Sequence, residues 1–349
     1  MAAAWDDAEG CHHVGVLELT APGGADATAP APLRIRHALQ VPTRAHAVLP
    51  GPNATLVAVA RRPGAWMLRW RPGSPAATAR WHWSEADRSF NGHVQADGQH
   101  ALVCTETDAA DGAGLLVRRD AQTLAVLQEW PTGGTDPHAV LALPEGGWLV
   151  ANGGVPTRPE SGRVKGDRST MDSSLVRLDA QGAPQGAWRL ADKRLSLRHL
   201  ARHGNGLVGV ALQAEHDAAE DRRDAPLIAL WDGQHLRVGE RAPLQGYAGD
   251  IVARPAGFML SATRAGRVAQ FDLQGRWVAH HPLAKVCAVA PLDKLGWIAG
   301  GSEHAMAHGR DGIDNSVASF ARAGGLRIDN HWACYDPPAP RPGNPKVAA

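Results

Sequence analysis

The chain has 349 residues, with 36 basic and 35 acidic side chains and a formal net charge of +1. This balance provides no extended positive field for nucleic acid, and the length fits one large domain or two ordinary ones. No run of about 18 apolar residues occurs, so the sequence predicts no membrane-spanning helix.

The N-terminal part predicts a lead-in followed by two strands. Residues 1–11 show no alternating pattern, and we expect an irregular segment there. Residues 12–20 (HHVGVLELT) alternate apolar and polar side chains, as a half-buried strand does, and residues 33–41 form the next such run. Residues 21–32 between them are rich in Pro, Gly and Ala and predict a loop.

A repeating pair of strands begins after residue 44. It is clearest at 91–108 (NGHVQADGQHALVCTETD), where two apolar runs flank an Asp97-Gly98 turn, a pattern typical of a hairpin. The same unit opens at residues 46, 93, 138, 199, 250 and 287. A second pair of runs follows the hairpin, and its turn reads DAQT, DAQG, WDGQ or DLQG in four of the units.

This repeat predicts the fold. The openings are 47, 45, 61, 51 and 37 residues apart. A period of about 45 residues with four short strands is typical of a β-propeller blade. We therefore predict an all-β fold, a single propeller of four-stranded antiparallel blades over residues 1–335, closed by pairing of the N- and C-terminal segments. Seven blades fit best and six are the alternative; residues 336–349 are Pro-rich and predict an irregular tail.

Three insertions follow second strands, at 155–174, 215–225 and 302–315, and their lack of periodicity predicts loops. Such loops are either lids over a functional face or plain surface excursions. The chain holds 12 Trp against four Phe and two Tyr, and we expect the tryptophans to pack between blades. Cys11 and Cys334 lie near the two ends, so a disulfide between them is an option in an oxidising compartment.

The polar residues of the repeats predict one chemically rich face. If strands a to d run outward from the axis in alternating directions, the entry into strand a and the b-to-c loop emerge on the same face. Polar side chains concentrate at these two places, whereas the opposite face receives plain turns such as PGPN and HGNG. Apart from histidine and cysteine, the expected members of this ligand-binding face are Arg44, Arg61, Arg62, Asn91, Glu106, Asp108, Asp136, Asn152, Arg198, Asp250 and Arg264.

Short motifs along the chain carry a family resemblance. They are RxH at 44–46, ARRPG at 60–64, NGH at 91–93, TETD at 105–108, DPH at 136–138, ANGG at 151–154, RHLA at 198–201 and CAVA at 287–290. As an ordered set, covering about residues 10 to 301, they resemble the DUF1513 proteins. The resemblance implies a YVTN/WD40-like propeller, twin-arginine export to the periplasm, and imelysin-like or dihaem proteins of iron uptake as partners. It implies no activity. Residues 1–7 (MAAAWDD) show no export signal, so a cytoplasmic location is the alternative.

Four histidines, His46, His93, His138 and His199, open four successive blades at one position. If they point to the axis, neutral imidazoles can share one ion such as Fe, Cu or Zn, with Cys287 as a further ligand. The alternative is that each histidine hydrogen-bonds the neighbouring blade. The predicted arginines oppose a bare cation and suit a carboxylate or phosphate ligand, which a metal chelate would reconcile; buried Arg–carboxylate ties between blades are the alternative.

These observations favour a monomeric, exported binding protein that holds a metal ion, a metal chelate or a partner protein on its His/Arg face. The alternatives are a redox or hydrolytic enzyme with a His-ligated axial metal, and a pure interaction scaffold. The sequence has no G-x-S-x-G elbow around a serine, and His and Arg outnumber oxygen ligands on the face, which disfavours hydrolase and Ca²⁺ sites.

Overall fold

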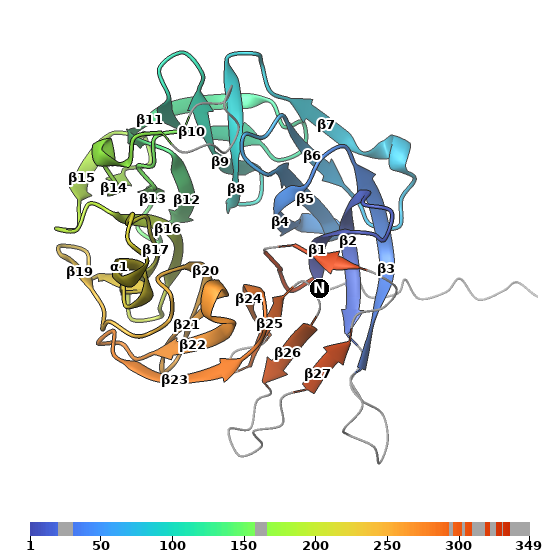
Figure 1. Ribbon diagram of the computed structural model, residues 1–349. Helices are drawn as coiled ribbons and strands as arrows, with labels where there is room; N and C mark the ends of the chain where they lie inside the picture. Colours follow the sequence, from blue (N-terminus) through green and yellow to red (C-terminus); the bar gives the residue numbers. More distant parts are fainter. Residues whose placement is uncertain are drawn as a thin grey trace, which may run out of the picture.

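A computed structural model describes residues 1–19, 31–157, 166–292, 296–301, 304–308, 318–321, 326–329 and 331–335. Seven four-stranded blades surround a central axis (Figure 1). The predicted all-β propeller is confirmed, with seven blades rather than six. None of the helices in the described segments is long and apolar enough to cross a membrane.

Blades 1 to 6 follow chain order, with the first strand of each at the axis. Blade 1 contains β4 (Ala45–Gly51), β5 (Thr55–Ala60), β6 (Trp66–Trp70) and β7 (Arg80–Trp83). Blade 2 contains β8 (Arg88–Asp97), β9 (Ala101–Asp108), β10 (Ala113–Asp120) and β11 (Val126–Thr135). Blade 3 contains β12 (Pro137–Ala142), β13 (Trp148–Asn152), β14 (Ser174–Leu178) and β15 (Pro184–Trp188).

The next three blades repeat this plan. Blade 4 contains β16 (Leu195–Arg202), β17 (Val208–Ala214), β18 (Ile228–Trp231) and β19 (Leu236–Val238). Blade 5 contains β20 (Ala248–Arg254), β21 (Gly257–Ala262), β22 (Arg267–Phe271) and β23 (Trp277–Pro282). Blade 6 contains β24 (Val286–Pro291), β25 (Trp297–Gly301), β26 (His304–His308) and β27 (Ala318–Ala321).

Blade 7 joins the two ends of the chain, as predicted. Its order is β28 (Arg327–Ile328), β1 (Ala2–Asp6), β2 (His12–Leu19) and β3 (Ala31–Val41). The C-terminal β28 pairs antiparallel with β1, and the backbones of Ala2 and Ala333 exchange two hydrogen bonds. The outer strands of blades 6 and 7 also pair, β27 running parallel to β3. The ring is therefore closed at the axis and at the rim.

Two expectations were wrong. Residues 2–6 are a strand rather than an irregular lead-in, because β1 is the second strand of its blade and is covered on both sides. A strand buried on both faces needs no alternation of polar residues, so its Ala-rich sequence gives no period of two. The insertion at 302–315 contains β26, the third strand of blade 6.

The other insertions contain no strand in their described parts. A 3₁₀ turn, η4 (Arg168–Thr170), lies in the first, and a short helix, α1 (Ala219–Arg223), lies in the second. Arg168 of the first loop pairs with Asp217 of the second at 2.8 Å. Residues 336–349, expected to be an irregular tail, lie outside the described residues.

The core lies between blades. Every residue of β5 and of β21 is buried, because each second strand is covered by the blades on both sides. Tryptophans fill these interfaces: Trp130 of blade 2 contacts Trp148 of blade 3 at 4.8 Å between ring centroids. Trp188 of blade 3 meets Trp231 of blade 4 at 5.1 Å in the same way. The predicted packing role of tryptophan is confirmed for these pairs.

The recurring DAQT-type turns join the third and fourth strands. In each, an aspartate side chain accepts a backbone N–H from the residue two positions later; the aspartates are Asp120, Asp179, Asp232 and Asp272. Backbone hydrogen bonds lower the pKa of Asp120 and Asp232, since they favour the ionised carboxylate. The repeated sequence thus encodes a local Asx turn at the same place in four blades.

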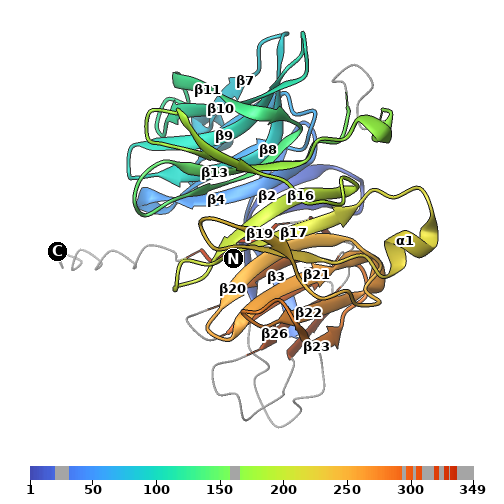
Figure 2. The same ribbon diagram turned by 90° about the vertical axis from the view of Figure 1, so that its left-hand side faces the viewer.

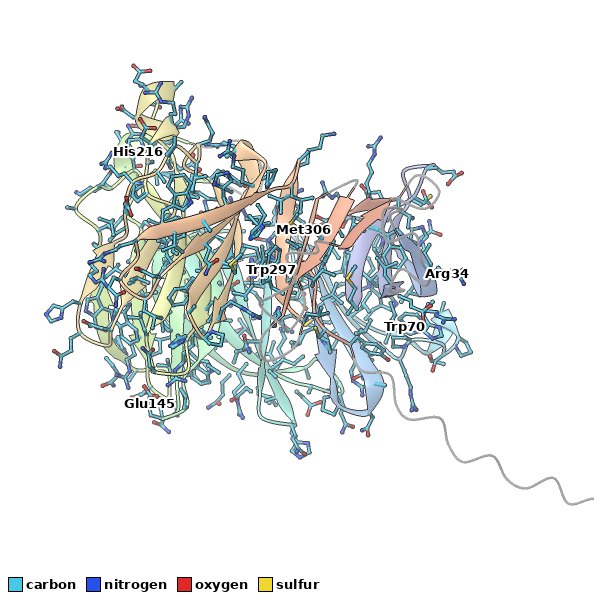
Figure 3. All side chains as sticks on the ribbon, turned by 90° about the horizontal axis from the view of Figure 1, so that it is seen from below. Arg34, Trp70, Glu145, His216, Trp297 and Met306 are labelled. Carbon is cyan, nitrogen blue, oxygen red and sulfur yellow. The ribbon has the colours of Figure 1, made fainter. Side chains whose placement is uncertain are left out.

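The two faces of the disc carry different connections. Loops between second and third strands emerge on one face, here called the polar face, where α1 projects (Figure 2). Figure 3 shows His216 of such a loop and Glu145 of a plain first-to-second-strand turn at opposite faces. No disulfide joins Cys11 and Cys334, so the bond considered for them is not formed.

Candidate metal centre on the propeller axis

A bulge interrupts the innermost strand of blades 1 to 6 at the same place. In blade 1 the register with β5 shifts between Ala45 and Ala47, and blades 2 to 6 show a register shift at the corresponding place. In blade 7 regular pairing ends at Ile328 and resumes at Ala333. A bulged residue leaves the ladder and its side chain is re-aimed. The seven residues so placed, here called the axial ring, are His46, His93, His138, His199, Asp250, Cys287 and His331.

The five histidines of the axial ring form one cluster. Ring centroids are 4.4 Å apart for His93 and His138, and 4.6 Å apart for His46 and His331. Two trios offer ring nitrogens that lie within 4.8 Å of one another, His46–His93–His138 and His93–His199–His331. Nitrogens bound to one zinc at about 2.1 Å lie no more than about 4.2 Å apart. Small side-chain adjustments therefore suffice to bring either trio onto one ion, and His93 belongs to both.

Several of these ring nitrogens lack a hydrogen-bond partner within the described residues. Both nitrogens of His46 are buried and unpartnered, as are Nε2 of His93 and Nδ1 of His138. Nε2 of His138 lies 3.3 Å from Nε2 of His199. A buried polar atom without a partner costs about 1–3 kcal/mol. His46 therefore does not make the hydrogen bond that a blade-to-blade tie would need.

Burial sets the protonation of the cluster. It lowers the pKa of His46, His93, His138 and His199 well below the ordinary value, and repulsion from neighbouring rings and arginines lowers it further. These imidazoles are neutral at pH 7, which is the form that binds metals. Burial, aided by Asp250, raises the pKa of Cys287 to about 12, so its thiol is protonated at neutral pH.

A hydrogen bond orients the fifth histidine. Nδ1 of His331 lies 3.1 Å from Oδ2 of Asp250, and Asp250 also accepts the backbone N–H groups of Ile251 and Val289. A carboxylate on one ring nitrogen fixes the tautomer and presents the other nitrogen as a lone-pair donor. The remaining nitrogen, Nε2, is buried and has no partner among the described residues. Asp250 thus positions His331 within the axial ring.

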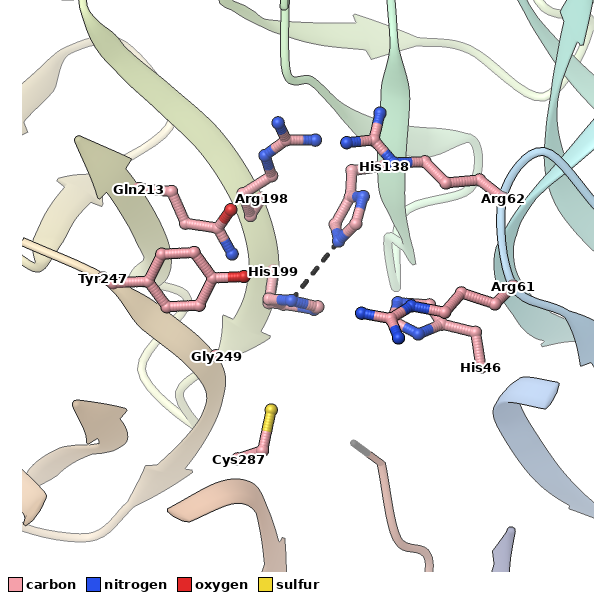
Figure 4. A pocket seen from close by; sticks show the side chains of 10 residues that line it. All are labelled: His46, Arg61, Arg62, His138, Arg198, His199, Gln213, Tyr247, Gly249 and Cys287. Atoms are coloured by element: carbon pink, nitrogen blue, oxygen red, sulfur yellow. Dashed lines mark hydrogen bonds between the residues drawn. The ribbon is translucent and has the colours of Figure 1, made fainter. Parts of the chain in front are cut away.

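A pocket with about 40 Å³ of room opens beside the axial ring, and Figure 4 shows the side chains around it. It is lined by His46, Arg61, Arg62, His138, Arg198, His199, Gln213, Tyr247, Gly249 and Cys287. Arg61 and Arg62 come from the second-to-third-strand loop of blade 1, so the pocket belongs to the polar face. Three of the five arginines and three of the four histidines predicted for one face therefore line this pocket.

Two of the pocket arginines share one carboxylate. Arg198 Nη1 lies 2.8 Å from Oδ2 of Asp136, and Arg62 pairs with the other oxygen of the same group. Gly153 leaves space for the Arg198–Asp136 pair, because a Cβ at this position would lie 2.6 Å from Oδ2 of Asp136. Arg61 has no ion-pair partner within the described part of the chain. The positive charge of the pocket arginines is therefore only partly neutralised by carboxylates.

The two remaining predicted arginines, Arg44 and Arg264, are not among the residues that line the pocket. Arg44 donates two hydrogen bonds to Asp329, at 2.7 and 2.9 Å, and so ties blade 1 to the closing strand of blade 7. The guanidinium of Arg264 lies over the ring of Tyr247, 4.6 Å from its centroid. A buried ion pair between blades, one of the two predicted roles for arginine, is present at Arg198, and the pair of Arg44 with Asp329 is partly buried.

Four other predicted residues make hydrogen bonds within blades 2 and 3 and do not line the pocket. Glu106 is buried and accepts from Arg119 at 2.6 Å, and Asn91 exchanges hydrogen bonds with Thr107. Asn152 donates to Ser174, while Asp108 accepts the backbone N–H of Ala110 in a turn.

The fifth histidine was missed by the sequence reasoning. His331 follows β28, which has only two residues, so no hairpin repeat marks it. A signal was present nonetheless. Seven blades require a seventh axial residue, and Asp329-x-His331 has the spacing of Asp136-x-His138. His331 is also the sole histidine between residues 309 and 349 of the sequence.

The comparison with known protein families identifies the family of this chain. Residues 39–335 match the model of a family described as "Protein of unknown function (DUF1513)". The chain belongs to this family. No curated protein matches this DUF1513 protein.

Solved structures share its fold. The Dos1 propeller is 10% identical, with a TM-score of 0.55, over 95% of this chain and 94% of that one. Saccharomyces cerevisiae Sqt1 is 11% identical, with a TM-score of 0.51, over 94% of this chain and 83% of that one. At such identities the likeness shows the propeller fold alone.

Proposed function

We propose that this DUF1513 propeller is a binding protein that holds one transition-metal ion in its axial ring, with His93 as the ligand common to both trios. The observation that carries the proposal is the convergence of buried histidine nitrogens without hydrogen-bond partners, delivered by a bulge from separate blades. Such nitrogens are costly in a protein interior unless something binds them.

The ligand types indicate the class of metal. Imidazole suits Zn, Cu, Fe and Ni, and a thiol or carboxylate at the same ring adds options without favouring Ca²⁺ or Mg²⁺. The pocket beside the ring has about 40 Å³ of room, which suits an ion and a few further atoms. This size favours binding of an ion over catalysis on a bulky molecule.

The setting is part of the proposal. We propose that the protein acts in periplasmic iron acquisition, beside imelysin-like or dihaem proteins. The family resemblance of the motifs supports this setting, and a ring of histidines is suited to the cargo.

Metal content measured by mass spectrometry tests the proposal. The protein is purified without an affinity tag, reloaded separately with Fe²⁺, Cu²⁺ and Zn²⁺, and desalted. Wild type is expected to retain about one equivalent of at least one of these ions. His93→Ala removes a ligand from both trios and is expected to abolish retention, whereas His46→Ala leaves the His93–His199–His331 trio and is expected only to weaken it.

The matched control is His235→Ala, because His235 lies in the turn between β18 and β19 with 76% of its side chain exposed. This variant should bind metal as wild type does, and circular dichroism should show all variants folded. A wild-type protein that retains none of the three ions after reloading would contradict the proposal. So would a folded His93→Ala variant with full metal content.

A further inference from the structure

We propose that the pocket beside the axial ring binds a small oxyanion, of the size of carbonate or phosphate, together with the metal ion. The inference rests on the proposed metal site and deepens it, because it names a second component that the ring takes up with the ion. It starts from the fact that one pocket is lined by three arginines and by three of the axial histidines.

Charge balance requires an anion when a cation occupies the ring. Arg61, Arg62 and Arg198 bring three positive charges to the pocket, and Asp136 is the carboxylate that pairs with two of them. Asp250 adds one negative charge at the ring. A divalent ion beside this set leaves a clear excess of positive charge in a largely buried place, where repulsion is poorly screened. A bound oxyanion removes that excess.

The donors that such an anion needs are present and unused. Arg198 is 1% exposed, yet its Nε–H has no hydrogen-bond partner among the described residues. Arg61 lines the pocket without an ion-pair partner in the same part of the chain. The hydroxyl group of Tyr247 points into the pocket from the side opposite Arg61 and Arg62 (Figure 4). Guanidinium groups bind carboxylate-like and phosphate oxygens in pairs, so they suit a planar or tetrahedral oxyanion.

The size of the pocket limits the ligand. About 40 Å³ of room suits one small anion. His46, His138 and His199 line the pocket together with the three arginines, so a ligand in this space contacts both sets. Metal and anion are therefore expected to bind cooperatively. The anion offsets the positive charge of the metal and the arginines, and the metal binds the histidine nitrogens that the anion leaves without a partner.

The test uses Co²⁺ alone as the metal probe, followed by visible absorption and calorimetry. Titrations are run in carbonate-free, phosphate-free buffer, then with added bicarbonate, and separately with added phosphate. At least one of the two anions is expected to tighten Co²⁺ binding tenfold or more, and the arm that does so identifies the anion. Arg61→Gln is expected to raise the anion-free affinity, because a positive charge is removed, and to abolish the anion effect. Arg34→Gln, on the exposed part of β3, is the control and should keep it.

The outcomes separate the two proposals. Equal Co²⁺ affinity with and without both anions would overturn the oxyanion site and leave the metal site standing. A full anion effect in Arg61→Gln would also overturn the placement in this pocket. Absence of Co²⁺ binding under every condition, together with no retained Fe, Cu or Zn, would remove both.

Discussion

Glycine at position 92 allows the axial cluster to form. Its φ is +96°, a conformation that glycine adopts readily, and a Cβ there would lie 2.6 Å from Cδ2 of His46. The imidazole of His46 therefore occupies space that any other residue at 92 would fill. Blade 1 contributes the imidazole of His46, and blade 2 contributes the space that this imidazole occupies.

Gly92→Ala is expected to lower metal affinity about tenfold or more and to destabilise the fold by more than backbone strain alone. Strain at a positive φ costs on the order of 1 kcal/mol. Gly98→Ala is the matched control, because its φ is +67° and no atom lies within 4 Å of the added Cβ. Titration with metal and urea unfolding of both variants measure the two effects. Equal metal affinities in the two variants would show that His46 tolerates the methyl group.

The histidine cluster also predicts how the metal-free protein responds to pH. The folded-state pKa of His46, His93, His138 and His199 lies well below that of the unfolded chain, which is about 6.5. Below pH 6.5 the unfolded chain binds protons that the folded protein does not. Stability is therefore fully present above about pH 7 and is lost as pH falls, by up to about 1.4 kcal/mol per pH unit for each imidazole.

Urea unfolding of metal-free protein between pH 8 and pH 5 measures this slope, which is the change in the free energy of unfolding per pH unit. His46→Gln is expected to make the slope shallower, because one titrating group is removed. The control His235→Gln, at an exposed site, should leave it unchanged. A slope in His46→Gln that equals the wild-type slope would show that His46 takes up its proton without unfolding.

Among the elements, the short closing strand β28 depends on the side chains that follow it. Trp332 is buried next to His331, and its indole N–H donates to the carbonyl of Asp329 at 3.2 Å. Its ring covers Gly300 of β25 so closely that a Cβ there would lie 1.7 Å from the ring edge. Trp332 therefore anchors the last axial histidine to blade 6.

Trp332→Ala is expected to destabilise the protein by about 3–5 kcal/mol, the usual cost of emptying a buried aromatic site. Metal affinity should also fall, because His331 loses its anchor. Trp83→Ala is the control, since Trp83 lies on an outer strand with 55% of its surface exposed. Denaturant unfolding and metal titration give both numbers. A loss below about 1 kcal/mol for Trp332→Ala would mean that the closing segment is held by its backbone pairing instead.

At the scale of the whole molecule, the exposed apolar side chains are dispersed. Those that the structure describes lie mainly on the rim and are spread over six blades, with two of them adjacent on β11: Ile35, Trp83, Val126, Leu127, Val238, Val278 and Leu292. A stable dimer interface needs a contiguous apolar patch of several hundred Å². We expect a monomer of 36.9 kDa at micromolar concentration, as measured by light scattering during gel filtration. A concentration-dependent mass near twice this value would contradict the expectation.

Some elements could be predicted from the sequence and others could not, and the difference has physical causes. The hairpins of blades 1 to 6 repeat their turns and their apolar runs, so the period of the propeller and four of the axial histidines were predictable. The strand β1 and the axial residue His331 were not, because β1 is covered on both sides and β28 is too short to carry a pattern. Their positions follow from closure of the ring.

The sequence by itself determined the all-β repeat, the Asx turns and the concentration of His and Arg on one face, because these depend on neighbours along the chain. Only the tertiary structure decided which of those residues meet. Pairing across blades placed Arg198 and Arg62 on one carboxylate and left Arg61 without an ion-pair partner among the described residues. It kept Glu106 inside its own blade with Arg119. Ring closure brought residues 46 and 331 to one axis, with ring centroids 4.6 Å apart, and no local pattern contains that contact.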